Sequence, residues 1–139
     1  MIKFCLFLFV SVMLFAQSPP VRLVNGVAVP DDFPDIEVRQ YGETAPGKIF
    51  MGSTFINDGT GNYLIILEND GTPCYYRKFD SNQDNRGSGE FQLQANELLT
   101  AYLFDEQFYI AFDSTFAIVD TFRCKNGYTT DAHELVLRP

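Results

Sequence analysis

Residues 63–71 read Tyr63-Leu64-Ile65-Ile66-Leu67-Glu68-Asn69-Asp70-Gly71, a short apolar run followed by a turn signal. Runs of this length, rich in β-branched and aromatic residues and bounded by turn residues, are typical of β-strands. The Asp-Gly pair readily supplies the positive φ angles of a tight hairpin turn, so residues 72–79 are predicted to pair back onto residues 63–68. This stretch therefore predicts an antiparallel sheet in the middle of the chain.

Segments of similar length lie on both sides of this hairpin. We expect a strand at residues 48–55 before it, and strands at residues 90–94, 98–104, 107–112 and 117–122 after it. The 139 residues include 14 Phe and 7 Tyr, which favour strands, and no long window shows the 3.6-residue period of a helix. Short strands about 8 to 12 residues apart indicate an all-β sandwich, barrel or propeller.

A repeat separates these three architectures. A shift of 45 residues lays residues 108–113 on residues 63–68, and each segment is followed by a turn and an apolar strand. A period of about 45 residues with four short strands is that of a β-propeller blade. The chain has material for about two blades, whereas a ring needs at least about four. We favour a fragment of a longer propeller; a self-associating chain and a small sandwich with an accidental repeat are the alternatives.

Residues 1–18 have the parts of a secretory signal peptide. Lys3 gives a cationic start, an apolar run follows from Phe4 to Ala16, and Gln17 and Ser18 end it. The apolar run is shorter than the ~20 residues that a membrane-spanning helix needs, so a membrane anchor is the weaker alternative. We therefore predict export to the periplasm or the extracellular space, with no membrane contact after cleavage.

Residues 19–47 contain five of the seven prolines. Proline is confined to strand edges and ends, so this stretch is predicted to be an extended lead-in with at most one short edge strand, at residues 36–41. Residues 48–139 are then the predicted partial propeller of about two blades.

The charge of the chain argues against two classes of partner. Cleavage of residues 1–18 removes one Lys and no acid, which leaves 9 basic and 18 acidic residues and a net charge of −9. Nucleic acid and anionic membranes are bound by clustered Lys and Arg, so neither is expected as a partner. Cys74 and Cys124 also remain; they form a disulfide or stay as two separately buried thiols, and their spacing does not choose between these.

The only histidine, His133, lies in the polar run of residues 126–134. Carboxylates beside an imidazole favour its charged form and fix its tautomer, so His133, oriented by Asp131 or Glu134, is a candidate for proton transfer or nucleophilic chemistry. A surface histidine in a loop that enters a strand explains the same residues without any chemistry.

A longer pattern surrounds His133. It comprises residues 91–102, 109–114 and 119–122, the tripeptide Asn126-Gly127-Tyr128 and the closing Asp131-Ala132-His133-Glu134. With these residues, the chain from about residue 45 to its end resembles the N-terminal part of the bacterial arylsulfate sulfotransferase family. The closing Asp-x-His-Glu is the most specific element. Glu97 stands where the family usually has a hairpin glycine, a change that is expected to loosen the turn.

The resemblance implies an exported six-bladed propeller that moves a sulfuryl group from an aryl sulfate to a phenol through a transiently sulfated histidine. It implies that His133 binds sulfate or stabilises the transition state, with Asp131 and Glu134 as its orienters. The nucleophilic histidine and an arginine would lie beyond Pro139, so residues 19–139 are expected to be inactive alone. The expected macromolecular partners are the remaining blades or further copies of the chain. The rival interpretation is an exported, non-catalytic propeller that serves in binding or adhesion.

No cofactor or metal is expected. Residues 80–91 begin like a calcium-binding loop, but Asn85 occupies the sixth position, where glycine is needed, and Phe91 the twelfth, where a bidentate Glu belongs. A solvated loop between strands is the preferred interpretation. The Cys and His spacings do not fit a zinc site.

Overall fold

The computed structural model describes residues 20–53, 59–79 and 87–139. The predicted signal peptide and most of the loop that begins like a calcium site lie outside these ranges. Within them, the regular structure consists of β-strands alone, which confirms the predicted all-β class. Among the residues described, no helical segment meets the length and hydrophobicity that a bilayer span requires.

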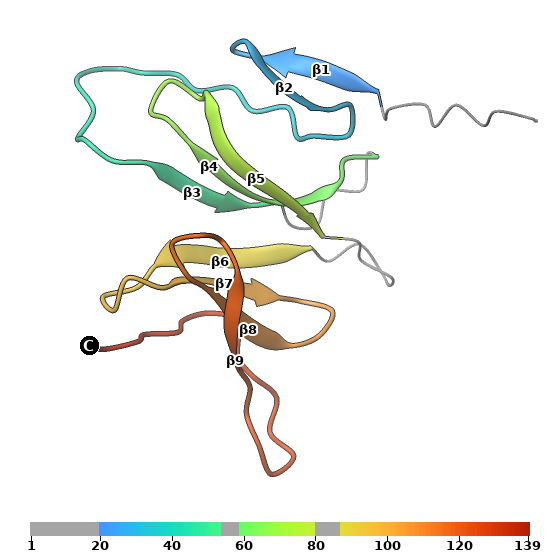
Figure 1. Ribbon diagram of the computed structural model, residues 1–139, viewed down its shortest axis with the longest axis vertical. Helices are drawn as coiled ribbons and strands as arrows, with labels where there is room; N and C mark the ends of the chain where they lie inside the picture. The colour runs from blue at the N-terminus through green and yellow to red at the C-terminus, as the bar shows by residue number, and fades with distance from the viewer. Residues whose placement is uncertain (1–19, 54–58, 80–86) are drawn as a thin grey trace, which may run out of the picture.

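The strands form three antiparallel sheets (Figure 1). The first is a hairpin, the second has the order β3-β4-β5 and the third the order β6-β7-β8-β9. Each sheet is therefore an up-and-down meander, and none closes on itself in the described chain. The strands are β1 Val21–Val24, β2 Val27–Pro30, β3 Ile49–Gly52, β4 Asn62–Leu67, β5 Pro73–Phe79, β6 Ser88–Leu93, β7 Leu99–Leu103, β8 Phe108–Phe112 and β9 Ile118–Phe122.

From residue 59 onward the observed strands follow the sequence prediction. The bounds of β4, β5, β7, β8 and β9 lie within one residue of the predicted ones, while β6 starts two residues early. β3 occupies only the first part of the predicted segment at residues 48–55, the end of which lies outside the described residues. Tight turns on both sides of each apolar run explain this agreement.

The lead-in at residues 19–47 differs from its prediction. The expected edge strand at residues 36–41 does not form, and β1 and β2 pair as a hairpin instead. Asn25 and Gly26 form its turn with φ angles of 47° and 82°, as a type I′ turn requires. Asn-Gly between apolar runs is a strong hairpin signal. The many prolines of this stretch predict an extended segment rather than a hairpin. Pro30, however, is the last residue of β2, a position where a strand tolerates proline.

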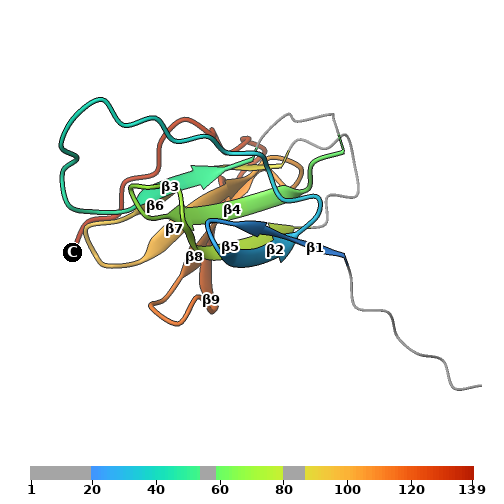
Figure 2. The ribbon, with the colours of Figure 1, turned by 90° about the horizontal axis from the view of Figure 1, so that it is seen from above.

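The sheets stack in three layers, with the second sheet in the middle (Figures 1 and 2). Leu64 and Ile66 of β4 pack in a core cluster with side chains of β6, β7 and β8. Tyr63, Ile65 and Leu67 pack in another cluster with Val29 of the hairpin. Successive side chains of a strand point to opposite faces. Because both faces of β4 are covered, this strand is apolar at every position from Tyr63 to Leu67 rather than at alternate positions.

The second and third sheets meet through their first strands, since β6 contacts both β3 and β4. A Cβ atom on Gly52 would lie 2.1 Å from the carbonyl oxygen of Ser88, and one on Gly87 would lie 2.3 Å from that of Ser53. Only glycine lets two main chains approach this closely. The edges of β3 and β6 therefore lie main chain against main chain.

The segment after β9 covers the other face of the third sheet. The Tyr102 hydroxyl donates to the carbonyl oxygen of Thr130 at 2.8 Å. Gln94 donates through Nε2 to the carbonyl oxygen of Leu135 at 2.8 Å, and its Oε1 accepts from the backbone N–H of Leu137 at 2.9 Å. Residues 131–134 are thus held between two points of attachment to the third sheet.

Candidate functional site

Asp131 and His133 form a side-chain pair in this C-terminal segment. Nδ1 of His133 lies 2.5 Å from Oδ1 of Asp131, and the same oxygen accepts the backbone N–H of His133 at 3.2 Å. This contact orients the ring and leaves Nε2 for another partner. The side chains of His133 and Asp131 are 91% and 76% exposed, so the imidazole stands at the surface of the described chain.

The pair favours the charged form of each group. The hydrogen bond to Asp131 and the charge of this carboxylate raise the pKa of His133 above its ordinary value, and the charge of Glu90 adds to the rise. The hydrogen bond from His133 lowers the pKa of Asp131 in turn. Because both groups are exposed, water and salt screen much of this attraction. The pair thus favours the imidazolium form of His133 and holds the ring in place through a residue of its own segment.

Glu134, the other candidate orienter, lies outside the pair of Asp131 and His133. It is exposed, and within the described chain it forms no ion pair with His133. The structure therefore brings together Asp131 and His133 and leaves Glu134 beside them.

Tyr109 is a buried tyrosine of the third sheet whose hydroxyl group stands out in the structure. It faces Tyr102 across β7 and β8, is 1% exposed, and its hydroxyl has no hydrogen-bond partner among the described residues. Burial, together with the charges of Glu90 and Asp131, raises the pKa of Tyr109 to about 12. Tyrosines at alternating strand positions are common in cores, so the sequence alone held no signal for this one.

A groove of about 410 Å³ lies between β3 and β6. Gln92, one of its lining residues, donates to the carbonyl oxygen of Leu135 at 3.2 Å, which joins the groove to the segment that carries His133. Its described lining is Phe50, Met51, Gly52, Gly89, Glu90, Phe91, Gln92 and Phe104.

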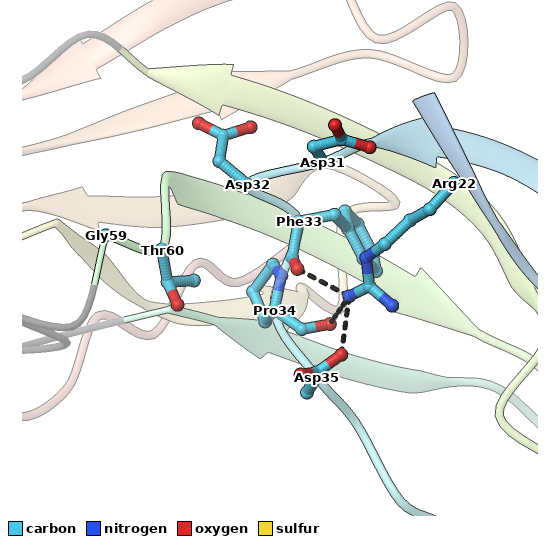
Figure 3. A pocket seen from close by; sticks show the side chains of 8 residues that line it. All are labelled: Arg22, Asp31, Asp32, Phe33, Pro34, Asp35, Gly59 and Thr60. Carbon is cyan, nitrogen blue, oxygen red and sulfur yellow. Dashed lines mark hydrogen bonds and ion pairs between the residues drawn. The ribbon is translucent and has the colours of Figure 1, made fainter. Parts of the chain in front are cut away.

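A second pocket, of about 390 Å³, lies beside the hairpin (Figure 3). Arg22 crosses it and donates through Nη2 to the carbonyl oxygens of Phe33 and Pro34 at 2.6 and 3.0 Å, and it pairs with Asp35 at 2.8 Å. Asp32, also in the lining, accepts from Tyr63 and pairs with Lys78, each at 2.6 Å. Asp32 thus links the lead-in to the second sheet. The polar side chains of the pocket are mainly carboxylates, together with an arginine that is already hydrogen-bonded within the chain.

Cys74 and Cys124 form neither the disulfide nor the pair of buried thiols that the sequence allowed. Both are free and both residues are exposed, so they are neither bridged nor buried. Across the described ranges, no three His, Cys, Asp or Glu side chains gather as a metal site.

Comparisons of the chain with protein families, with curated proteins and with solved structures found no significant match.

Proposed function

We propose that the chain is the N-terminal part of an exported propeller enzyme that transfers a sulfuryl group from an aryl sulfate to a phenol. The observation that carries this proposal is the Asp131–His133 pair, with its oriented, charge-favouring imidazole and its available Nε2. A sulfuryl group in transfer carries negative charge on its nonbridging oxygens, and a preorganised cationic donor aimed at them lowers the barrier. His133 is this donor; the nucleophilic histidine and an arginine come from residues beyond Pro139.

The packing of the sheets supports the propeller arrangement. The third sheet is a four-stranded meander, as a blade is. β6 packs on β3 and β4, the first two strands of the preceding sheet. The segment after β9 is likewise hydrogen-bonded to the first two strands of its own preceding sheet, through Gln92 of β6 and Tyr102 of β7. We infer that residues 135–137 begin a third blade. The β1–β2 hairpin covers the opposite face of the second sheet, where the last blade of a ring would lie, so it belongs to that blade in this proposal.

A transfer assay tests the proposal. The protein encoded by the reading frame that continues past Pro139 should move the sulfuryl group of 4-nitrophenyl sulfate to phenol. Replacing His133→Asn should lower kcat/KM by roughly 10²–10³ without changing the circular dichroism spectrum, as for the loss of one preorganised donor. Residues 19–139 alone should transfer nothing. A folded His133→Asn variant with full activity would contradict the assignment of His133.

An exported, non-catalytic propeller for binding or adhesion is the second candidate. The 91% exposure of the His133 side chain favours it, because a catalytic donor acts best where water is excluded. The downstream reading frame separates the two. Further blades with histidines and an arginine favour the enzyme, and blades without them favour the binding protein.

A further inference from the structure

We propose that the outer edge of β1 pairs antiparallel with a further strand, which comes from the part of the polypeptide that follows Pro139. The source of this strand rests on the proposed function, whereas the capacity of β1 to take up a strand does not. β1 lies in the hairpin at one end of the stack of sheets and pairs with β2 alone among the described strands (Figure 1).

The main chain of β1 has unpaired groups on this edge. The type I′ turn makes Val24 a member of a hydrogen-bonded pair with β2, and bonded pairs recur at every second residue of an antiparallel ladder. The bond from the N–H of Asp31 to the carbonyl oxygen of Pro20, at 3.3 Å, fits this phase. Val21 and Leu23 therefore direct their N–H and C=O groups away from β2, and these groups have no partner within the described ranges.

The side chains of β1 leave this edge unprotected. Val21 and Leu23 are apolar and are 62% and 71% exposed. Arg22, the only charged residue of the strand, points to the opposite face and is bonded within the chain. Native edge strands are usually protected by charge, proline or a bulge. The edge strand β5 carries Arg77 and Lys78, and the pairing of β9 with β8 is irregular, so β1 differs from both.

A groove of about 480 Å³ runs along β1. Residues 22–25 form one wall, and residues 35–37 of the lead-in form the other. Asp35 and Glu37 are exposed and Ile36 is half-buried, which is the alternation of an extended segment with one face packed. A strand that is added to a sheet needs such a space beside the edge. The groove therefore gives the additional strand a place to lie.

The unpaired main-chain groups decide the class of partner. N–H and C=O groups that alternate along an edge are matched over their whole length by another extended polypeptide, as in β-strand addition. Apolar side chains of the added strand would lie beside Val21 and Leu23, where cross-strand contacts stabilise a sheet. The partner is thus a strand with apolar side chains at alternate positions.

The shortness of β1 favours a strand of the same polypeptide. Only Val21 and Leu23 present outward main-chain groups, enough for about four hydrogen bonds. A separate chain must offset its lost translational and rotational freedom with these few bonds, whereas a tethered strand binds at a high effective concentration. A second copy is further disfavoured because the acidic chains repel each other. In the proposed ring, the last blade adjoins the hairpin and supplies the strand.

Amide hydrogen exchange, measured by NMR, tests the pairing. The chain that ends at Pro139 is compared with the protein encoded by the reading frame that continues past it. The amide of Leu23 should exchange at least about a hundredfold more slowly in the longer protein, because a hydrogen-bonded amide exchanges only when the structure opens. The amide of Arg22, which is bonded to β2, should be protected in both. Equal exchange at Leu23 in the two folded proteins would overturn the inference.

Two proline variants give an independent test. The N–H of Leu23 points away from β2 and that of Val24 toward it, so Leu23→Pro removes only the outward bond while Val24→Pro breaks the hairpin. Leu23→Pro should lower the Tm of the longer protein by roughly 2–4 °C and leave that of the shorter chain nearly unchanged. Val24→Pro should lower both. An equal effect of Leu23→Pro on the two proteins would refute the pairing.

The outcomes separate this inference from the proposed function. Protection of Leu23 in a longer protein without transfer activity would support the pairing and refute only the enzyme. An unprotected Leu23 in an active enzyme would refute only the pairing. Protection of Leu23 in the shorter chain that increases with its concentration would refute the source of the strand, since the partner would then be a second copy.

Discussion

Gly52 lies so close to Ser88 that a Cβ atom added to it would stand 2.1 Å from the Ser88 carbonyl oxygen. This contact joins the first strands of two successive sheets. Gly52→Ala should therefore lower the free energy of unfolding by about 1–3 kcal/mol or more, because the main chains must move apart. Gly42→Ala is the matched control, since nothing lies within 4 Å of its added carbon. Urea denaturation measures both, and equal stabilities would show that the strands are not in contact.

Glu97 has a φ of 67° in the turn between β6 and β7. Because a side chain strains this left-handed conformation, Glu97→Gly should raise the free energy of unfolding by up to about 1 kcal/mol. Glu106→Gly, at a position without a positive φ, should lower it instead. Thermal unfolding of the two variants checks the signs, and a loss of stability in Glu97→Gly would contradict the observed turn.

Tyr102 and Tyr109 face each other, but only the hydroxyl of Tyr102 has a partner among the described residues. Tyr109→Phe should thus be neutral or raise the free energy of unfolding by about 1 kcal/mol, because it removes an unsatisfied buried hydroxyl. Tyr102→Phe should lower it by about 1 kcal/mol through the lost bond to Thr130. A marked destabilisation in Tyr109→Phe, measured by denaturant titration, would reveal a partner for its hydroxyl.

The imidazole signals of the only histidine report the Asp131–His133 pair directly. Asp131→Asn should lower the pKa of His133 toward the ordinary 6.5, whereas Glu134→Gln should change it less. Because folding raises the pKa of His133 and lowers that of Asp131, the pair contributes its stability fully between the ordinary values of 3.8 and 6.5. This stability is lost as the pH rises through the folded-state pKa of His133 or falls through that of Asp131. An NMR pH titration that finds the same pKa in Asp131→Asn and the wild type would show that the pair does not form in solution.

Local signals were enough to predict most of the third sheet and much of the second. The apolar runs of β4, β5, β7, β8 and β9 each lie between turn residues, and such turns fix strand ends without reference to the rest of the fold. The β1–β2 hairpin has an equally local signal in Asn25-Gly26, but the prolines on both sides of it predict an extended segment instead. The stacking order of the sheets depends on long-range contacts such as Gly52 with Ser88, which no local pattern encodes.

The candidate site was predictable only in part, for the same reason. Asp131 and His133 are two residues apart, so their pairing follows from local sequence. Glu90 lies in a bulge whose register depends on the pairing of β6 with β7. Tyr109 becomes notable only because its hydroxyl is buried without a partner in the described chain. Register and burial belong to tertiary structure, so sequence patterns alone miss them.

A crystal structure of the protein encoded by the complete reading frame tests the central claim most directly. We expect residues 135–137 to form the first strand of a third sheet, the sheets to surround an axis with β3 and β6 innermost, and Nε2 of His133 to face the channel beside Glu90. A structure with His133 on the outer rim, or with no further sheet packed on residues 131–137, would contradict it.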